Sequence, residues 1–289
     1  MDVFCIGNLN YDISFHISRL PSMHEKIRCE DATFSCGGSA GNTACWLGSL
    51  GFETGMVGTV GNDPFGNVQL QDLASYRVNT EKVRKIGATG IAVILVEGEA
   101  KRMIKFTGAN QWMKIDESMR DASHIHLSSN PRTVVEEVLK MCKDTSATLS
   151  WDPQELLFRA LVPHFNYLFM NEDDLKRETG TKTLKKAADT LAAQCLVVTK
   201  NGGGCLIVTD EITDIPPFGY AAVDSTGAGD AFDAGFISGL LTQHMPKDCG
   251  ILGTATSSMK VQHHGARGGI CDRDGLNAFL KKHDLKLTL

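Results

Sequence analysis

The sequence has no apolar run that approaches the ~20 residues needed to span a bilayer, so we expect no contact with membrane. Its opening, MDVFCIGNLN, lacks the basic and apolar regions of a signal peptide. The net charge is −5 and no dense Lys/Arg run occurs, which argues against a nucleic-acid partner. The nine cysteines form no CxxC pair, and several lie in apolar runs. This pattern predicts reduced core thiols and a cytoplasmic protein.

No internal repeat, low-complexity segment or proline-rich linker divides the chain, so we expect one domain over residues 1–289. Short, nearly continuous apolar runs are typical of strands buried on both faces, and they alternate here with helix-like segments. This alternation predicts a mostly parallel sheet flanked by helices. The predicted strands are 3–7, 54–61, 90–98, 124–129, 148–152, 167–172 and 195–199, and the predicted helices are 39–50, 64–77, 133–143, 181–193 and 227–243.

Two segments interrupt this alternation with extended stretches that have no intervening helix. They span about residues 8–35 and 88–107, and the second resembles a hairpin with its turn near residues 97–99. We interpret them as a small β-sheet lid on the main domain. The exposed edge of such a lid favours a homodimer formed through it, since unpaired edges tend to be covered.

The stretch DSTGAGD, residues 224–230, precedes an apolar run with helical spacing. Gly227, Ala228 and Gly229 therefore lie at a helix start, where unpaired N–H groups and the helix dipole can hold an anion. Asp230 would repel a bound phosphate, so its expected role is to orient and deprotonate a hydroxyl group beside this anion hole. Together they indicate phosphoryl transfer. Taken alone, the stretch also fits a helix start with glycines used for packing.

Two further glycine-rich stretches carry candidate ligand contacts. In CGGSAGNTACWLG, Gly37 and Gly38 precede a predicted helix and Asn42 lies in its first turns, where it could bind hydroxyl groups; a plain glycine turn is the alternative. LVVTKNGGGCLIV reads as a β-hairpin, and Thr199 with the glycine backbone of its turn could also contact a nucleotide. These two interpretations of the hairpin are compatible.

Together these stretches resemble the ribokinase (PfkB) family of carbohydrate and nucleoside kinases, archaeal-type nucleoside kinases in particular, over essentially the whole chain. The matching motifs are DSTGAGDAFDAGF, GGSAGN, VGTVGNDPFG and GNLNYD. The resemblance implies an α/β, ribokinase-like three-layer sandwich with a mostly parallel central sheet and a small β lid. It also implies an ATP-dependent kinase that uses Mg²⁺.

The resemblance assigns roles to individual residues. Asp230 becomes the general base, with the anion hole at Gly227, Ala228 and Gly229. The substrate-binding set is Asn10, Asp12, Gly37, Gly38, Ser39, Asn42 and Phe106. The nucleotide-binding set is Asn171, Thr199, Asn201, Gly202, Gly204, Thr226 and Ser258.

The metal-handling motif of the family, N-x-x-E, departs from its pattern in NEDD. Asp174 replaces the glutamate and is one methylene shorter, so Glu172 is a second candidate for holding Mg²⁺ through water. Asp224 is a candidate site for a monovalent cation such as K⁺. Adjacent histidines 263 and 264 would point in different directions on a helix, so we interpret them as exposed or packed side chains and not as metal ligands.

Ser39 bears on the substrate. Ribose-using relatives often carry lysine after the glycine pair, so a serine favours a nucleoside, phosphorylated on its 5′-OH. Phe15, Phe106 or Trp112 could stack on its base. The alternative is a sugar such as ribose, fructose or a ketodeoxy sugar acid, the acid being clamped by Arg102 and Lys105.

Two other function classes fit less well. A non-catalytic nucleotide-binding regulator would lack the base, yet Asp230 is present. A Rossmann dehydrogenase would carry G-x-G-x-x-G after the first strand, where the chain has GNLN.

Overall fold

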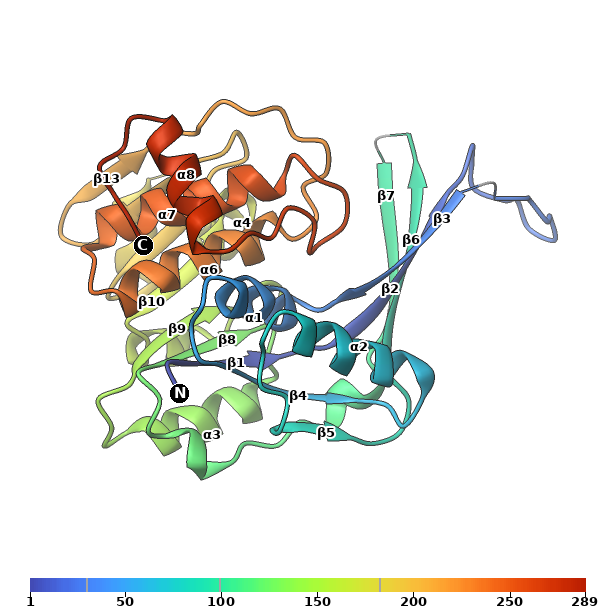
Figure 1. Cartoon of the computed structure of the whole chain (residues 1–289), viewed down its shortest axis with the longest axis horizontal. Coiled ribbons are helices and arrows are strands. Elements are labelled where there is room, and N and C mark those ends of the chain that lie inside the picture. The colour runs from blue at the N-terminus through green and yellow to red at the C-terminus, as the bar shows by residue number, and fades with distance from the viewer. Residues whose placement is uncertain (30, 99, 182) are drawn as a thin grey trace.

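A computed structural model describes residues 1–29, 31–98, 100–181 and 183–289 (Figure 1). Its centre is a nine-stranded sheet in the order β13-β12-β11-β10-β9-β8-β1-β4-β5. Neighbouring strands from β5 to β11 are parallel, whereas β12 and β13 are added antiparallel at one edge. The strands are β1 (Val3–Gly7), β4 (Thr54–Val60), β5 (Val83–Lys85), β8 (His124–Ser128), β9 (Thr148–Asp152), β10 (Tyr167–Asn171), β11 (Leu196–Thr199), β12 (Cys205–Val208) and β13 (Ile212–Ile215).

Helices cover both faces of this sheet, which gives the three-layer α/β sandwich that the sequence predicts. Successive β1 residues alternate between two apolar clusters: Phe4 packs with one and Cys5 with the other. One cluster includes residues of α3 (Arg132–Cys142), α4 (Glu172–Thr179) and α5 (Leu184–Leu191). The other includes residues of α1 (Ser39–Ser49), α2 (Pro64–Ser75), α6 (Ala228–Leu241), α7 (Pro246–Lys260) and α8 (Arg273–Lys282). Short 3₁₀ segments occur at Gly108–Trp112, Glu117–Met119 and Arg159–His164.

Helices α6 and α7 pack with their backbones close together. A Cβ at Gly253 would lie 2.8 Å from the main-chain oxygen of Phe232, and one at Gly235 would overlap the Thr256 hydroxyl. Only glycine allows this approach. The Thr256 hydroxyl also donates 2.7 Å to the carbonyl of Ala231. The two helices therefore pack as one closely joined pair.

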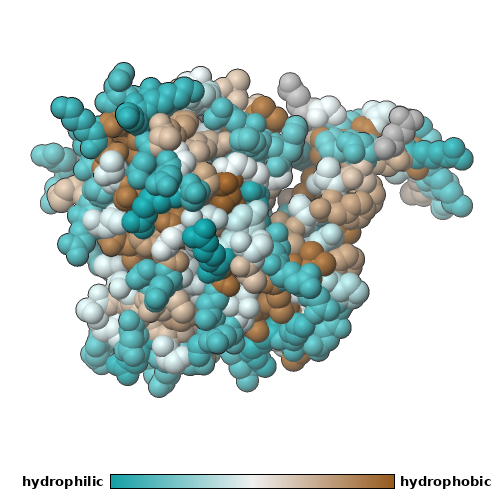
Figure 2. All heavy atoms as spheres, in the orientation of Figure 1, coloured by the Kyte–Doolittle hydropathy of each residue, from teal (hydrophilic) through white to brown (hydrophobic). Residues whose placement is uncertain are grey.

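A separate four-stranded sheet, in the order β3-β2-β6-β7, projects from the body (Figure 1). Its strands are β2 (Asn10–His16), β3 (Asp31–Gly37), β6 (Gly90–Glu97) and β7 (Ala100–Phe106). Three of them lie inside the two segments that the sequence assigns to a lid, and β3 extends two residues beyond the first segment. The hairpin turn predicted near residues 97–99 includes Glu99, which lies outside the described residues. Hydrophilic residues gather at the far end of this lid and along the outer margin of the visible body, whereas the centre of this face is mixed (Figure 2).

Within the described part of the chain, no helix has the length and apolarity that a bilayer crossing requires. The helix predicted over 181–193 spans Leu184–Leu191, and it ends there because Ala192 adopts a left-handed conformation. Helix α7 ends at Lys260, so histidines 263 and 264 lie after this helix.

Candidate active site

Two cavities lie at the carboxyl ends of the central strands, and lid residues line one of them. The lid cavity, of about 460 Å³, lies between lid residues such as Asp12 and Lys105 and the start of α6. The hairpin cavity, of about 770 Å³, lies between the β11–β12 turn and α7. Both are lined by Asn171, Asp174, Thr199 and Gly229, so the two cavities meet at these four residues.

Most residues that the sequence assigns to a site line one of these cavities. Beside the shared four, the predicted residues of the lid cavity are Asn10, Asp12, Gly38, Ser39, Asn42, Thr226, Gly227 and Asp230. The predicted residues of the hairpin cavity are Asn201, Gly202, Gly204, Ala228 and Ser258. Four predicted residues line neither: Gly37, Phe106, Glu172 and Asp224.

Phe106 differs from the expectation because of strand register. Met103 and Lys105 of β7 line the lid cavity, and neighbouring side chains on a strand point to opposite faces. Phe106 therefore faces away from the cavity, and 55% of its surface is exposed. Phe15 and Trp112 do not line the cavity either. The apolar lid residues that do line it are Ala92 and Met103.

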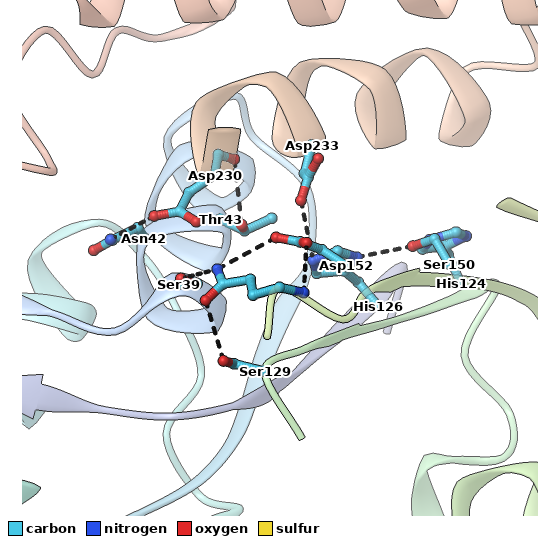
Figure 3. A network of polar contacts seen from close by, with 11 residues as sticks. Ser39, Asn42, Thr43, His124, His126, Ser129, Ser150, Asp152, Asp230 and Asp233 are labelled. Atoms are coloured by element: carbon cyan, nitrogen blue, oxygen red, sulfur yellow. Dashed lines mark hydrogen bonds and ion pairs between the residues drawn. The ribbon is translucent and has the colours of Figure 1, made fainter. Parts of the chain in front are cut away.

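Asp230 lies in the first turn of α6 and is 7% exposed. Asn42 Nδ2 donates to its Oδ2 at 2.7 Å, and the Thr43 hydroxyl donates to its main-chain oxygen at 3.2 Å (Figure 3). Burial raises the pKa of Asp230 to about 6, although the Asn42 hydrogen bond opposes this rise. A carboxylate with this pKa is ionised at neutral pH and is still basic enough to accept a proton.

Arg267 fixes the orientation of Asn42. Its Nε donates to Asn42 Oδ1 at 3.0 Å, so the amide nitrogen of Asn42 is the atom that faces Asp230. The guanidinium is held in turn by an ion pair with Asp72. The sequence assigns Asn42 to substrate hydroxyls, whereas in the structure its amide positions the carboxylate of Asp230.

The backbone at the start of α6 provides unpaired donors. Gly227 has φ 78°, and a Cβ there would lie 2.5 Å from the carbonyl oxygen of Ala266. Among the described residues, the N–H groups of Gly227 and Gly229 have no hydrogen-bond acceptor, whereas that of Ala228 donates to the Ser225 carbonyl at 3.1 Å. A Cβ at Gly229 would meet nothing within 4 Å. The donors available at this helix start therefore belong to the two glycines and not to Ala228.

The glycine pair before α1 leaves room for the lid residues. A Cβ at Gly37 would overlap the carboxylate of Asp12, and Gly38 has φ 96°. Burial raises the pKa of Asp12 to about 6, opposed by the positive charge of Arg267. Asn10 Oδ1 accepts 2.8 Å from the side chain of Asn110.

Three further carboxylates, which the sequence analysis missed, line the lid cavity: the exposed Glu155, and Asp152 and Asp233. Burial and the charge of Asp230 raise the pKa of Asp152 to about 7, and burial with the charge of Asp152 raises that of Asp233 well above its ordinary value. Figure 3 shows both residues beside Asp230. The position of Asp152 at the end of a predicted parallel strand was the signal that could have identified it.

A chain of polar contacts extends from Asp233 of α6 to side chains of strands β8 and β9. Its Oδ2 lies 3.7 Å from His126 Nε2, and the Ser150 hydroxyl contacts rings of both His126 and His124, at 2.9 and 2.8 Å (Figure 3). Burial lowers the pKa of each histidine to about 3, so both rings are neutral at physiological pH. On the cavity side, Gln154 Nε2 donates 2.6 Å to the Ser39 hydroxyl and 3.3 Å to Asp152.

The acidic start of α4 supports the hairpin turn. Asn171 caps this helix by accepting from the Asp174 N–H at 2.8 Å, and Asp174 binds Arg177 at 2.6 Å. Glu172 Oε2 accepts a hydrogen bond from the Asn201 N–H at 3.0 Å. The Glu172 carboxylate thus orients the β11–β12 turn and does not face a cavity. In the chain as described, no three His, Cys, Asp or Glu residues form a group that could hold a metal ion. His263 and His264 are exposed.

Asp224 is occupied by protein donors. Its Oδ1 accepts from the Thr226 N–H at 3.0 Å and the Thr226 hydroxyl at 2.7 Å, and its Oδ2 accepts from the Gly265 N–H at 2.9 Å. Lys101 from the lid lies 3.1 Å from Oδ1. Although burial acts to raise it, these hydrogen bonds hold the pKa of Asp224 well below its ordinary value.

Comparison with known proteins agrees with this geometry. The family described as pfkB family carbohydrate kinase matches residues 1–272. An ATP-dependent ribose-1-phosphate kinase of Halopiger xanaduensis is 29% identical, covering 97% of this chain and 98% of that protein. A nucleoside kinase of Methanocaldococcus jannaschii is 26% identical, covering 97% of each.

Two solved structures have the same fold over nearly the whole chain. Arabidopsis thaliana ribokinase, complexed with ribose and ATP, gives a TM-score of 0.89 at 25% identity and covers 96% of this chain and 98% of its own. The nucleoside kinase of Methanocaldococcus jannaschii gives a TM-score of 0.86 at 24% identity and covers 98% of this chain and 99% of its own.

Proposed function

Since the chain belongs to the pfkB family of carbohydrate kinases, a family of phosphotransferases that act on sugar or nucleoside hydroxyls, we propose that it transfers the γ-phosphoryl group of ATP to the 5′-OH of a nucleoside. The observation that carries this proposal is the position of Asp230. It lies in the lid cavity one residue after Gly229, which lines both cavities and whose N–H group has no acceptor among the described residues.

The two cavities suit the two substrates. ATP occupies the hairpin cavity, along the glycine turn and Ser258, with its γ-phosphate directed toward Gly229. The acceptor occupies the lid cavity with its hydroxyl beside Asp230. The acceptor oxygen forms a bond to the γ-phosphorus while the bond to the bridging oxygen of ADP breaks. The hydroxyl proton passes to Asp230 and from there to solvent, and the N–H groups of Gly227 and Gly229 stabilise the transferring group.

Mg²⁺ would be held mainly by the phosphates of ATP. Asp174 lines both cavities and is the carboxylate best placed to bind metal-coordinated water. The described residues offer no cage of three acidic or sulfur ligands, which suits Mg²⁺, since this ion usually keeps several waters. When bound, the ion would supply positive charge to the phosphates.

A nucleoside is the acceptor that the lid favours. Ala92 and Met103 give the lid cavity an apolar wall for a base, and the neutral Ser39 follows the glycine pair. A second candidate is a ribose that carries phosphate at C1, because Lys105 of the lid also lines this cavity. Both candidates present the same 5-hydroxymethyl group to Asp230 and differ only in what C1 carries.

We also propose that the protein is a homodimer joined through the lid. Phe34, Ile13, Val93 and Ile104 lie in one cross-strand row, and they belong to the face opposite Asp12 and Lys105. Phe34 and Ile104 are 59% and 67% exposed. A partner lid would cover this apolar face, and Ile104→Lys should then convert the dimer to a monomer in light scattering.

The nine free cysteines support a reducing compartment, the cytoplasm.

The test is ATP-dependent phosphorylation of a panel of nucleosides, ribose 1-phosphate, ribose, fructose and a ketodeoxy sugar acid, with Asp230→Asn as the blank. Turnover of nucleosides above the others supports the proposal. Turnover of ribose 1-phosphate alone would mean that C1 of the acceptor carries a phosphate and not a base. Turnover of a free sugar alone would refute the assignment of the C1 substituent. A panel without turnover, in protein that still binds ATP, would refute the proposed acceptor class.

A further inference from the structure

Lys260, the last residue of α7, has no exposed surface. Its Nζ donates to the main-chain oxygen of Asp224 at 2.7 Å and to that of His263 at 3.0 Å. Within the described residues no carboxylate oxygen lies within the 4.0 Å of an ion pair with this ammonium group. A buried cation is therefore bound by backbone carbonyls alone.

The two carbonyls belong to the two segments that form the back of the anion hole. One segment leads from Asp224 to Gly227, and the other runs from Val261 to Ala266. The N–H groups of Val223 and Asp224 donate to the carbonyl of Val261 at 2.7 and 3.2 Å. Gly227 packs directly on Ala266. Lys260 thus joins the segments at the point that sets the position of the Gly227 N–H group.

Burying an ammonium group is unfavourable unless its surroundings compensate. Here burial lowers the pKa of Lys260, and the negative charges of Asp224 and Asp230 act in the opposite direction. The carboxyl end of α7 also favours a cation. An ammonium group carries the same charge as K⁺, and both are satisfied by carbonyl oxygens.

We propose that Lys260 is an internal cation that positions the anion hole, so that this enzyme needs no dissolved monovalent cation at Asp224. The proposal rests on the proposed kinase function, and it replaces the sequence-based expectation of a K⁺ site beside Asp224. Lys260 does not touch either substrate. It acts by fixing the carbonyls of residues 224 and 263, and by adding positive charge behind the transferring phosphoryl group.

The first experiment measures kinase activity of the unmodified enzyme without K⁺, with tetramethylammonium holding the ionic strength at about 0.1 M. Replacing tetramethylammonium by K⁺ should change kcat less than about twofold, because the ammonium of Lys260 already supplies the charge. Strong activation by K⁺ would overturn the proposal even if no variant could be prepared.

The second experiment compares Lys260→Ala, which opens space for an ion, with Lys260→Met, which fills the same volume without charge. Both should lose about 10²-fold in kcat without K⁺, the scale of losing one group that stabilises the transferring anion. K⁺ or NH₄⁺ should restore Lys260→Ala in a saturable manner and leave Lys260→Met inactive. Lys247→Ala, an exposed lysine at the start of the same helix, is the matched control and should retain full activity.

A merely structural lysine would give a different pattern, in which the alanine variant is not rescued by any cation. A measurement of melting temperature tests this inference independently of the kinase proposal, because the measurement requires no turnover. K⁺ should raise the melting temperature of Lys260→Ala and leave that of the unmodified protein unchanged. If no acceptor is phosphorylated but this thermal pattern holds, the kinase proposal fails and the internal cation stands. If both proteins respond alike to K⁺, the internal cation is refuted.

Discussion

Replacing Asp230 by asparagine should stabilise the folded protein while it removes catalysis. Asp230 is almost fully buried, and burial raises its pKa from 3.8 to about 6. Asparagine keeps the shape and can still accept the hydrogen bond from Asn42. Because the side chain lines the lid cavity, the added amide N–H groups can reach water. The substitution therefore removes mainly the charge.

The magnitude follows from proton linkage. Between pH 3.8 and about 6 the folded state holds a proton that the unfolded state has lost, so the ionised carboxylate destabilises the folded state at higher pH. A difference of about two pH units at about 1.4 kcal/mol each gives about 3 kcal/mol. The advantage of Asp230→Asn should be complete above about pH 7, shrink as the pH falls through 6, and vanish below about pH 4.

Urea unfolding of both proteins across this pH range tests the reasoning, with Asp121→Asn as a control. Asp121 is exposed, so its substitution should change the free energy of unfolding by less than about 0.5 kcal/mol at every pH. Equal midpoints for the unmodified protein and Asp230→Asn at about pH 8 would refute the burial argument. A constant advantage down to pH 4 would also refute it, because the gain would then have nothing to do with charge.

Three other predictions use the same site. Gly229→Ala should leave the melting temperature unchanged or slightly raised, because its Cβ meets nothing within 4 Å, yet it should lower kcat/KM about 10²-fold by filling the junction of the cavities. Gly227→Ala, at φ 78°, should instead lose about 1–3 kcal/mol of stability. Equal melting temperatures of the two variants would contradict this reasoning. Arg267→Met should destabilise the fold by about 3–5 kcal/mol, because it breaks the ion pair of this largely buried side chain with Asp72. It should also move the pH profile of kcat to higher pH, because the charge of Arg267 lowers the pKa of Asp230. An unchanged profile in the folded variant would exclude that role. In the unmodified enzyme kcat should rise with pH through about 6 and then level off, and a rate independent of pH from 5 to 8 would argue against Asp230 as the base.

The central sheet could be predicted because its strands are buried on both faces and so appear as short continuous apolar runs. Helix α4 could not, because Leu175 is the one buried residue in EDDLKRET and the segment has no apolar period. Strand β13 lies at the sheet edge and is mostly exposed, so its sequence resembles a loop. The direction of β12 follows from the tight glycine turn, which permits only an antiparallel return.

The candidate site was predictable where one short segment contains it, as in the glycines and Asp230 at the start of α6. Contacts between distant segments were not: Arg267 lies 225 residues after Asn42, and no local pattern indicates that they meet. The orientation of Phe106 depends on strand register, and a shift of one residue reverses the face. Glu172 was assigned to metal by its charge, although in the structure it binds the Asn201 N–H.

The four residues shared by the two cavities have a thermodynamic consequence. In the proposed arrangement, with nucleotide and acceptor each in its own cavity, both ligands meet a wall that contains Asn171, Asp174, Thr199 and Gly229, so we expect binding of one to affect binding of the other. By linkage the effect is reciprocal: the factor by which acceptor changes the Kd of ATP equals the factor by which ATP changes the Kd of acceptor. Each dissociation constant of this enzyme is therefore defined only together with the occupancy of the other cavity.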